Sequence, residues 1–142
     1  MFPKNIQILI VDDSPTVLSH LHYLLAGMGY QNIIKAEDGE AAINQLFKYE
    51  TIRHPIDLII CDWSMPRVNG MEVLHIMRKN PEWANRPFIF LTASGEVNSV
   101  CTAIEAGVDD YIIKPVNAQI LAQKLATVFL KIQGSEHQKK SS

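Results

Sequence analysis

Short, continuous runs of apolar residues recur along the chain, and each run is followed by a stretch with helical spacing. Apolar runs of this kind, bounded by polar residues, are typical of strands buried on both faces of a parallel sheet. Between the runs, apolar residues recur at intervals of three and four, which indicates amphipathic helices. The predicted strands are five segments: 6–11, 32–36, 57–61, 87–91 and 110–114.

The predicted helices carry recognisable start and stop signals. Ser14 and Pro15 form an N-cap followed by proline at the first helical position, and this helix should end around Gly27–Gly29. The other four helices should begin near Asp38, Asn69, Glu96 and Asn117, and the one from Glu96 should end at Gly107.

The apolar faces of the helices predict which side chains enter the core. For the second and third helices, these are Ala42, Ile43, Leu46 and Phe47, then Val73, Ile76 and Met77. For the first and fifth helices, they are Leu18, Leu21 and Leu25, then Ile120, Leu121, Leu125, Val128 and Phe129.

Strict alternation of strands and helices predicts the fold class. Five β–α pairs favour an α/β fold with a parallel sheet, helices on both of its faces, and right-handed crossovers. The ending "GSEHQKKSS" is polar and is predicted to be a disordered tail. We therefore expect one domain over 1–133 and a tail over 134–142.

Composition narrows the functional classes. The chain has 142 residues, which suits one domain, and its net charge of −2 gives no basic surface for nucleic acid or an anionic membrane. No apolar stretch is long enough for a membrane helix, and the N-terminal run is too short for a signal peptide. Cys61 and Cys101 lie in apolar segments. They are interpreted as buried free thiols, which favours the reducing cytoplasm.

Polar side chains follow four of the five predicted strands. Asp12 and Asp13 follow the first strand, Asp62 the third, Thr92 the fourth and Lys114 the fifth. Each has an ordinary explanation: an aspartate can form a turn or favour a helix N-terminus, a threonine can cap, and a lysine can be solvated. Open α/β sheets bind ligands at the carboxyl ends of their strands, and the ordinary explanations account poorly for this joint occurrence.

Clustered carboxylates favour a cation, because mutual repulsion raises their pKa values and costs stability. Mg²⁺ prefers oxygen ligands and is commonly held by one or two carboxylates together with phosphate oxygens. Aspartate is also a known nucleophile in aspartyl-phosphate chemistry. The set therefore indicates a Mg²⁺ site with a phosphoryl group as its other occupant. Lys114 would neutralise phosphoryl charge and Thr92 could donate a hydrogen bond.

Four segments of the chain carry a resemblance to a known family: "ILIVDDS", "LIICDWSMPRVNG", "FIFLTAS" and "AGVDDYIIKP". Together they resemble the receiver domains of two-component response regulators, most closely the CheY-like single-domain type. The resemblance covers residues 5–132. It implies a doubly wound, flavodoxin-like sheet with strand order 2-1-3-4-5.

The resemblance implies roles for the acidic residues. Asp62 matches the phosphoacceptor of the family. Asp13 matches the carboxylate that binds Mg²⁺ directly, and Asp12 matches its partner, which usually acts through water. Ser64 matches the position whose backbone carbonyl completes the metal shell.

It also implies a switch. Thr92 matches the switch hydroxyl, Lys114 the lysine that contacts the phosphoryl group, and Tyr111 the aromatic residue that turns inward on activation. Pro115 matches a proline that follows a cis peptide bond. Phosphorylation would then repack the face formed by the fourth helix, the fifth strand and the fifth helix, which binds a downstream protein.

The partners implied are a sensor histidine kinase or phosphotransfer protein and a downstream target, with no direct nucleic acid and no membrane insertion. The chain would be a monomer or a phosphorylation-dependent dimer, and a signalling domain rather than a turnover enzyme. Two positions depart from a common pattern: Ser64 stands where chemotaxis members often have Asn, and Ser94 replaces a frequent acidic residue. Both would flank the attacking water during dephosphorylation.

Three other classes of protein share part of this pattern. A haloacid-dehalogenase-type phosphatase typically needs a second aspartate two residues after the nucleophile, where this chain has Ser64. A flavin-binding flavodoxin-like domain would have a loop rich in Ser, Thr and Gly in place of Asp12-Asp13. A pseudo-receiver that acts only as an interaction scaffold remains an alternative. His20 and His22 are two residues apart and are interpreted as part of a solvated helix face.

Overall fold

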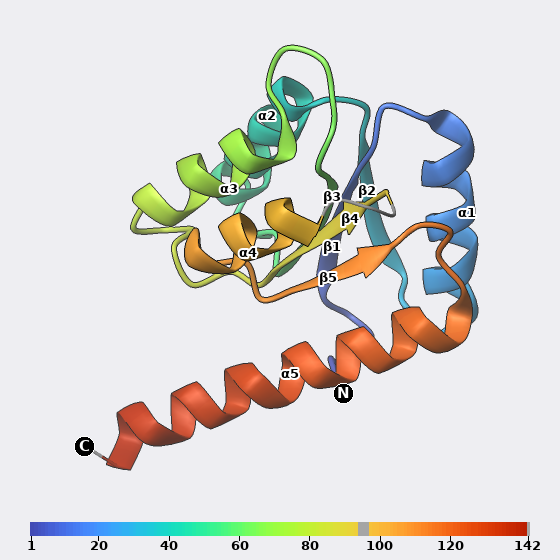
Figure 1. The fold of residues 1–142 in the computed structure, drawn as a ribbon. Helices are drawn as coiled ribbons and strands as arrows, with labels where there is room; N and C mark the ends of the chain where they lie inside the picture. Colours follow the sequence, from blue (N-terminus) through green and yellow to red (C-terminus); the bar gives the residue numbers. More distant parts are fainter. Residues whose placement is uncertain (94–96, 142) are drawn as a thin grey trace.

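The fold is an alternation of strands and helices (Figure 1). The computed structural model describes residues 1–93 and 97–141, with side chains described for 1–93 and 101–134. The strands are β1 (Gln7–Val11), β2 (Asn32–Ala36), β3 (Leu58–Asp62), β4 (Phe88–Thr92) and β5 (Asp110–Ile113). The helices are α1 (Pro15–Gly27), α2 (Gly39–Thr51), α3 (Gly70–Lys79), α4 (Val97–Glu105) and α5 (Ala118–Ser141).

The five strands form one parallel sheet in the order β2-β1-β3-β4-β5. β1 and β3 are neighbours in the middle of the sheet, with Val11 opposite Cys61. β5 lies at one edge, where Thr92 of β4 pairs with Ile113. The strand order reverses between β1 and β3, so the crevice at their carboxyl ends is the expected ligand position. The predicted α/β class and the strand order are confirmed.

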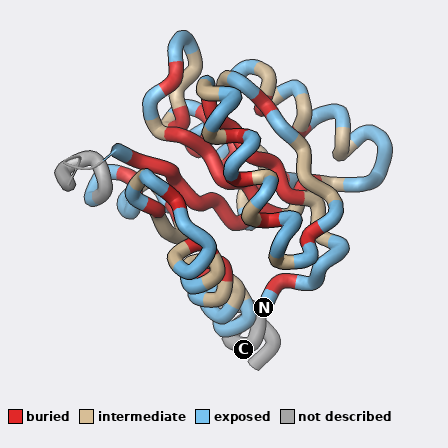
Figure 2. The backbone as a smooth tube through the Cα atoms, turned by 90° about the vertical axis from the view of Figure 1, so that its right-hand side faces the viewer, coloured by how far each residue is buried: buried red, intermediate tan, exposed pale blue. Residues whose placement is uncertain are grey.

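Helices cover both faces of the sheet and create two hydrophobic cores. Successive strand side chains point to opposite faces, so Ile8 and Ile10 enter one core and Leu9 and Val11 enter the other. The first core is completed by α1 and α5, and the second by α2, α3 and α4. Figure 2 shows the buried strands running through the centre of the molecule. This burial on both faces explains the continuous apolar runs in the sequence.

Polar caps start three of the helices close to the carboxyl ends of strands. The Ser14 hydroxyl accepts a hydrogen bond from the backbone N–H of Val17, at 3.3 Å. The Asp38 carboxylate accepts from Ala41 N at 2.7 Å, and the Asn69 side chain accepts from Glu72 N at 2.9 Å. These bonds satisfy N–H groups that have no partner within the helix. They also fix the connections that carry the acidic side chains.

Three expectations about burial are wrong. Phe47 on α2 is 56% exposed and Ile76 on α3 is 42% exposed. Cys101 is a free, exposed thiol on α4, in contrast to the buried Cys61. On α2 and α3 the buried stripe that faces the sheet is narrower than the apolar pattern of the sequence, and Cys101 lies two residues from the buried Ala103, on the other side of α4. The buried residues are Gly39, Ala42 and Leu46 on α2, and Gly70, Val73, Leu74 and Met77 on α3.

The last helix is the longest and projects beyond the body of the domain in Figure 1. It continues to Ser141 and so enters the segment 134–142. The division into a domain over 1–133 and a disordered tail stays a prediction. No helix in the described part of the chain has both the length and the apolar character that a membrane span requires.

Candidate functional site

Three carboxylates meet at the carboxyl ends of β1 and β3. Asp12 and Asp13 follow β1 directly, and Asp62 is the last residue of the neighbouring strand β3. One oxygen from each of these side chains lies within 4.8 Å of an oxygen from each of the others. Asp12 is fully buried and Asp62 is buried, whereas Asp13 is exposed. The convergence predicted from the sequence is therefore present.

Lys114 joins the two buried carboxylates. Its ammonium nitrogen lies 2.8 Å from Asp12 Oδ2 and 3.2 Å from Asp62 Oδ1. The other Asp12 oxygen accepts a hydrogen bond from the backbone N–H of Ser14, at 2.9 Å. The Lys114 backbone is itself fixed, because its N–H donates to Thr92 O at 2.8 Å. One cation thus partly balances a group of three carboxylates.

Burial and the charges in this group shift the pKa values of Asp62 and Lys114. Burial raises the pKa of Asp62, the nearby Asp12 carboxylate raises it further, and the attraction of Lys114 only partly opposes them. Burial by itself would lower the pKa of Lys114, but its hydrogen bond to Asp12 and the charge of Asp62 raise that pKa overall. The ionised Asp62 is therefore electrostatically unfavourable in the absence of further positive charge.

The arrangement fits a hard divalent cation. Three carboxylates at short separation, one of them open to solvent, supply the oxygen ligands that Mg²⁺ prefers and leave room for water. The roles of Asp13 and Asp62 as direct ligands, and of Asp12 as a partner acting through water, stay predictions from the resemblance. Ser64 is exposed on the loop after β3, where its backbone carbonyl is a further candidate.

The loop after Asp62 is fixed at both ends. Trp63 N–H donates to Leu91 O at 2.9 Å, and Gly70 N–H donates to Trp63 O at 3.0 Å. At Gly70, the first residue of α3, a Cβ would collide with the carbonyl oxygen of Asp62 and lie 2.8 Å from a carbon of the Phe90 ring. Only glycine allows α3 to start this close to Asp62. The sequence indicated Gly70 as a helix start but not as a close contact of the site.

Thr92 and Tyr111 extend the site across the sheet. Thr92 ends β4, which neighbours β3, and its buried hydroxyl donates to Ala93 O at 3.3 Å. Tyr111 pairs with Phe90 across β4 and β5 and is half-buried, with the Lys124 ammonium 4.8 Å from its ring centre.

Other sequence predictions about the site have mixed outcomes. The peptide bond between Lys114 and Pro115 is cis, as the resemblance implies. Ser94 lies outside the described residues. His20 is exposed, but its ring bonds to the backbone of Val116, a contact that the interpretation as a solvated face did not include.

Comparisons with known proteins agree with this geometry. The family model described as the response regulator receiver domain matches residues 8–126. A chemotaxis protein CheY homolog of Campylobacter jejuni is 35% identical, over 86% of this chain and 91% of that protein. Chemotaxis protein CheY-3 of Vibrio cholerae is 34% identical, over 91% of this chain and 95% of that protein.

Solved structures share the fold over similar lengths. Chemotaxis protein CheY4 of Vibrio cholerae has a TM-score of 0.76 and 27% identity, covering 87% of this chain and 98% of that one. The signal receiver domain of a histidine kinase from Syntrophus aciditrophicus has a TM-score of 0.72 and 33% identity, covering 86% and 88%. The matching segment includes every strand except the first residue of β1, and all the site residues described above. The chain belongs to the response regulator receiver domain family, and its relatives include CheY-type proteins.

Proposed function

We propose that this receiver accepts a phosphoryl group on Asp62 from the phosphohistidine of a sensor histidine kinase or a phosphotransfer protein. Receiver domains of this type are phosphoacceptor signalling domains that bind Mg²⁺ at an acidic site, and they are not turnover enzymes. The observation that carries the proposal is the convergence of Asp62 with Asp12, Asp13 and Lys114. Nucleophile, metal ligands and phosphoryl-binding cation are all present.

The chemistry is a transfer between two nucleophiles. A carboxylate oxygen of Asp62 forms a bond to phosphorus as the P–N bond of the phosphohistidine breaks, and the released imidazole takes up a proton from water. Bound Mg²⁺ would supply positive charge to the phosphoryl oxygens. Lys114 neutralises further charge and orients the group, as expected of a reaction in which the protein mainly positions and stabilises.

The switch that follows would run through Thr92 and Tyr111. Phosphoryl oxygens on Asp62 offer new acceptors to the Thr92 hydroxyl, whose position at the end of β4 is next to β3. Its movement would allow Tyr111 to turn inward from its half-buried position. A local charge event would thereby shift the balance between two packings of the same surface.

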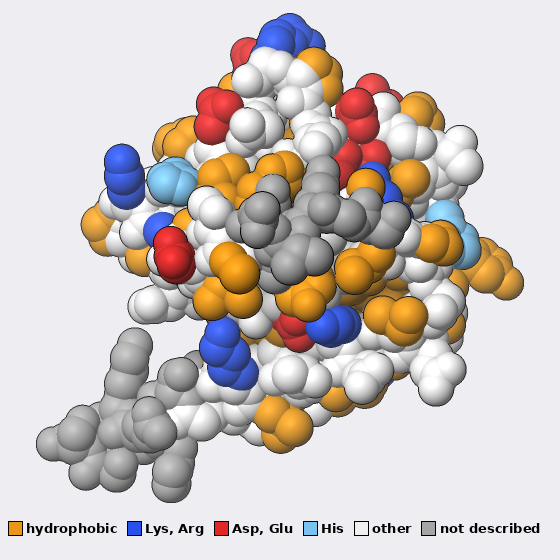
Figure 3. Space-filling view, in the orientation of Figure 1, with side chains coloured by type: hydrophobic (Ala, Val, Ile, Leu, Met, Phe, Trp, Pro, Cys, Tyr) orange, Lys and Arg blue, Asp and Glu red, His pale blue; other side chains and the backbone are white. Residues whose placement is uncertain are grey.

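The surface formed by α4, β5 and α5 is the proposed output face. Ile104 is 59% exposed and Ile113 is 49% exposed on this face, and Cys101 is exposed beside them on α4. Figure 3 shows hydrophobic side chains gathered around this region. The proposed occupant is a downstream protein or, in a phosphorylation-dependent dimer, a second copy of the chain. The cytoplasmic location stays a prediction.

A scaffold that is never phosphorylated is the alternative, and one experiment separates the two. The full chain is incubated with Mg²⁺ and acetyl phosphate, and its intact mass is measured. The proposal expects one added phosphoryl group in the wild type and none in Asp62→Asn. An unmodified wild type, beside a control receiver that becomes labelled, would favour the scaffold.

A further inference from the structure

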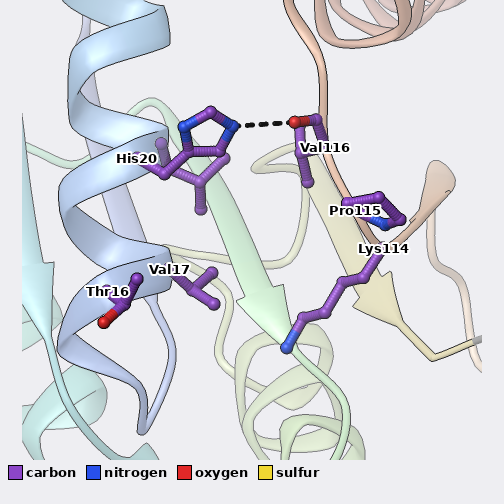
Figure 4. A pocket seen from close by; sticks show the side chains of 7 residues that line it. Thr16, Val17, His20, Lys114, Pro115 and Val116 are labelled. Atoms are coloured by element: carbon purple, nitrogen blue, oxygen red, sulfur yellow. Dashed lines mark hydrogen bonds between the residues drawn. The ribbon is translucent and has the colours of Figure 1, made fainter.

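A hydrogen bond joins the middle of α1 to the segment that follows β5. His20 Nε2 lies 2.9 Å from the carbonyl oxygen of Val116 (Figure 4). A carbonyl oxygen only accepts, so Nε2 carries the hydrogen and donates. The two residues are 96 positions apart, and His20 was otherwise expected to be a solvated surface residue.

This bond holds a segment whose first residue is Lys114. At the start of the segment, Lys114 N–H donates to Thr92 O on β4 and is fixed there. After it, α5 starts from a cap in which the Asn117 side chain accepts from Ile120 N at 2.8 Å. Because β5 is the edge strand, sheet bonds hold the segment from the β4 side only. The His20 bond adds a restraint from α1.

A cavity lies between α1 and this segment. Its volume is about 390 Å³, and its walls are Thr16, Val17, His20, Leu21, Lys114, Pro115 and Val116. Side chains therefore do not completely fill the space between the helix and the segment here, and the hydrogen bond joins two residues of the cavity wall. In Figure 4 the Lys114 side chain lies below the His20 ring, and Lys114 and His20 both belong to the cavity wall. Val116 packs in the core that it shares with Leu18 and Leu21 of α1, and the His20 bond adds a directional restraint to this packing at the wall of the cavity.

We propose that His20 is a positioning residue for Lys114. By holding the Val116 carbonyl, His20 keeps the backbone of the segment where the Lys114 ammonium reaches both Asp12 and Asp62. The inference rests on the proposed function, because it assigns His20 to the phosphoryl transfer that Lys114 supports. Transfer rates are sensitive to displacements of catalytic groups by a fraction of an ångström to one ångström.

The test uses His20→Leu, which removes the donor, and His20→Gln, whose amide nitrogen can reach a similar position and still donate. Phosphorylation of the full chain by acetyl phosphate is followed by intact mass across a range of donor concentrations. The maximal rate of His20→Leu should fall roughly tenfold, and His20→Gln should recover most of it. Mg²⁺ affinity, read from Trp63 fluorescence, should stay unchanged, because the proposed ligands follow β1, end β3 or lie on the loop after β3. His75→Leu and His75→Gln, at an exposed position of α3, are the matched controls and should keep the wild-type rate.

A double-mutant cycle separates positioning from a general effect on folding. In a Lys114→Met background, His20→Leu should cause little further loss of rate, because the group that His20 positions is gone. A full additional loss in that background would contradict the proposal. It would also be overturned if His20→Leu reacted at the wild-type rate, or if His20→Gln were as slow as His20→Leu.

A final measurement needs no phosphorylation. The NMR signals of the Lys114 side-chain methylenes, assigned by their loss in Lys114→Met, should shift in His20→Leu and stay in place in His20→Gln. Unchanged signals in His20→Leu would refute positioning by His20. An unreactive wild type whose Lys114 signals still respond to His20→Leu would instead overturn the proposed phosphoacceptor function and keep the structural link.

Discussion

The Lys114 ammonium lies closer to Asp12 than to Asp62, at 2.8 Å against 3.2 Å. In the unphosphorylated protein this lysine therefore bridges a fully buried carboxylate and the proposed phosphoacceptor. A phosphoryl group on Asp62 would bring new oxygens to the same ammonium. Lys114 thus has two tasks, since it stabilises the resting carboxylates and would neutralise the phosphorylated one.

Replacing Lys114 by methionine tests the first task. The variant leaves buried Asp12 without its cation and should lower the free energy of unfolding by about 1–3 kcal/mol in metal-free buffer. The difference from the wild type should narrow in saturating Mg²⁺, because the metal supplies the missing positive charge. Chemical denaturation with and without Mg²⁺ measures both effects.

Lys124→Met is the matched control for that experiment. Lys124 pairs with Asp110 at 2.8 Å and has nearly the same side-chain exposure as Lys114, 27% against 28%. Its partner Asp110 is outside the acidic group, so any loss of stability should be the same with and without Mg²⁺. A Mg²⁺-independent loss in Lys114→Met as well would contradict the charge-balance account.

Asp62→Asn should stabilise the metal-free protein at neutral pH. The raised pKa of Asp62, caused first by burial and then by Asp12, means that its ionised form is disfavoured in the folded state. Between the ordinary value of 3.8 and the raised value, the folded protein holds a proton that the unfolded chain has released. Stability of the wild type therefore falls as pH rises through that window.

Asp62→Asn removes the carboxylate and with it the cost of ionising Asp62 in the folded protein. Its melting temperature should exceed that of the wild type by several degrees at pH 7 in a chelator, and the gap should close below pH 4. Mg²⁺ should raise the melting temperature of the wild type more than that of Asp62→Asn. Melting curves from pH 3 to pH 8 decide the matter, and a variant less stable than the wild type at neutral pH would count against the assigned cause.

Gly70→Ala should disturb the site from outside it. The added methyl group would meet the Asp62 carbonyl and the Phe90 ring, so we expect a loss of about 1–3 kcal/mol and slower phosphorylation. Gly27→Ala is the control, because a Cβ at this position of α1 has no neighbour within 4 Å. It should be neutral or stabilising by about 0.5–1 kcal/mol. Equal changes in the free energy of unfolding would show that helix propensity, and not the close contact at Gly70, determines the effect.

Arg78 on α3 should contribute strongly to the stability of the fold. It bonds the segments that precede β4 and β5, at the amino ends of these strands. Its guanidinium donates to Gly107 O at 2.8 Å, to Arg86 O at 2.7 Å and to Asp109 Oδ2 at 3.1 Å. Arg78→Met should lower the free energy of unfolding by about 1–3 kcal/mol, because three acceptors lose a charged donor and two of these three bonds are part-buried. Lys79→Met, exposed on the same helix, should cost less than about 0.5 kcal/mol. Denaturant titration of both variants provides the comparison.

The acidic site could be predicted from the sequence because a parallel sheet brings all its strand ends to one edge. Asp12, Asp62 and Lys114 each follow an apolar run, so their convergence needed only the order of the strands. The spacing of apolar residues predicted burial less well for side chains at the edge of a helix's apolar face. Phe47 continues the apolar spacing of α2, yet it lies beside Trp83 at the rim, with ring centres 4.8 Å apart.

Contacts that depend on tertiary distance could not be predicted. The bond from His20 to Val116 joins segments 96 positions apart, and a lone histidine on a helix carries no signal of its partner. The close approach of Gly70 to Asp62 also depends on how α3 is placed against β3 and β4. The dipeptide Asn69-Gly70 indicates the start of a helix in the sequence, but the requirement for glycine at position 70 comes from the packing of α3.

Locating the modified residue decides whether Asp62 is the residue that carries the phosphoryl group. The protein is phosphorylated with acetyl phosphate and Mg²⁺, reduced with borohydride, and digested for mass spectrometry. Reduction converts an aspartyl phosphate into homoserine. The account predicts homoserine at position 62 in the wild type and at no position in Asp62→Asn. Homoserine at Asp12 or Asp13 instead of position 62, or unchanged aspartate at all three positions beside a receiver that is labelled, would contradict it.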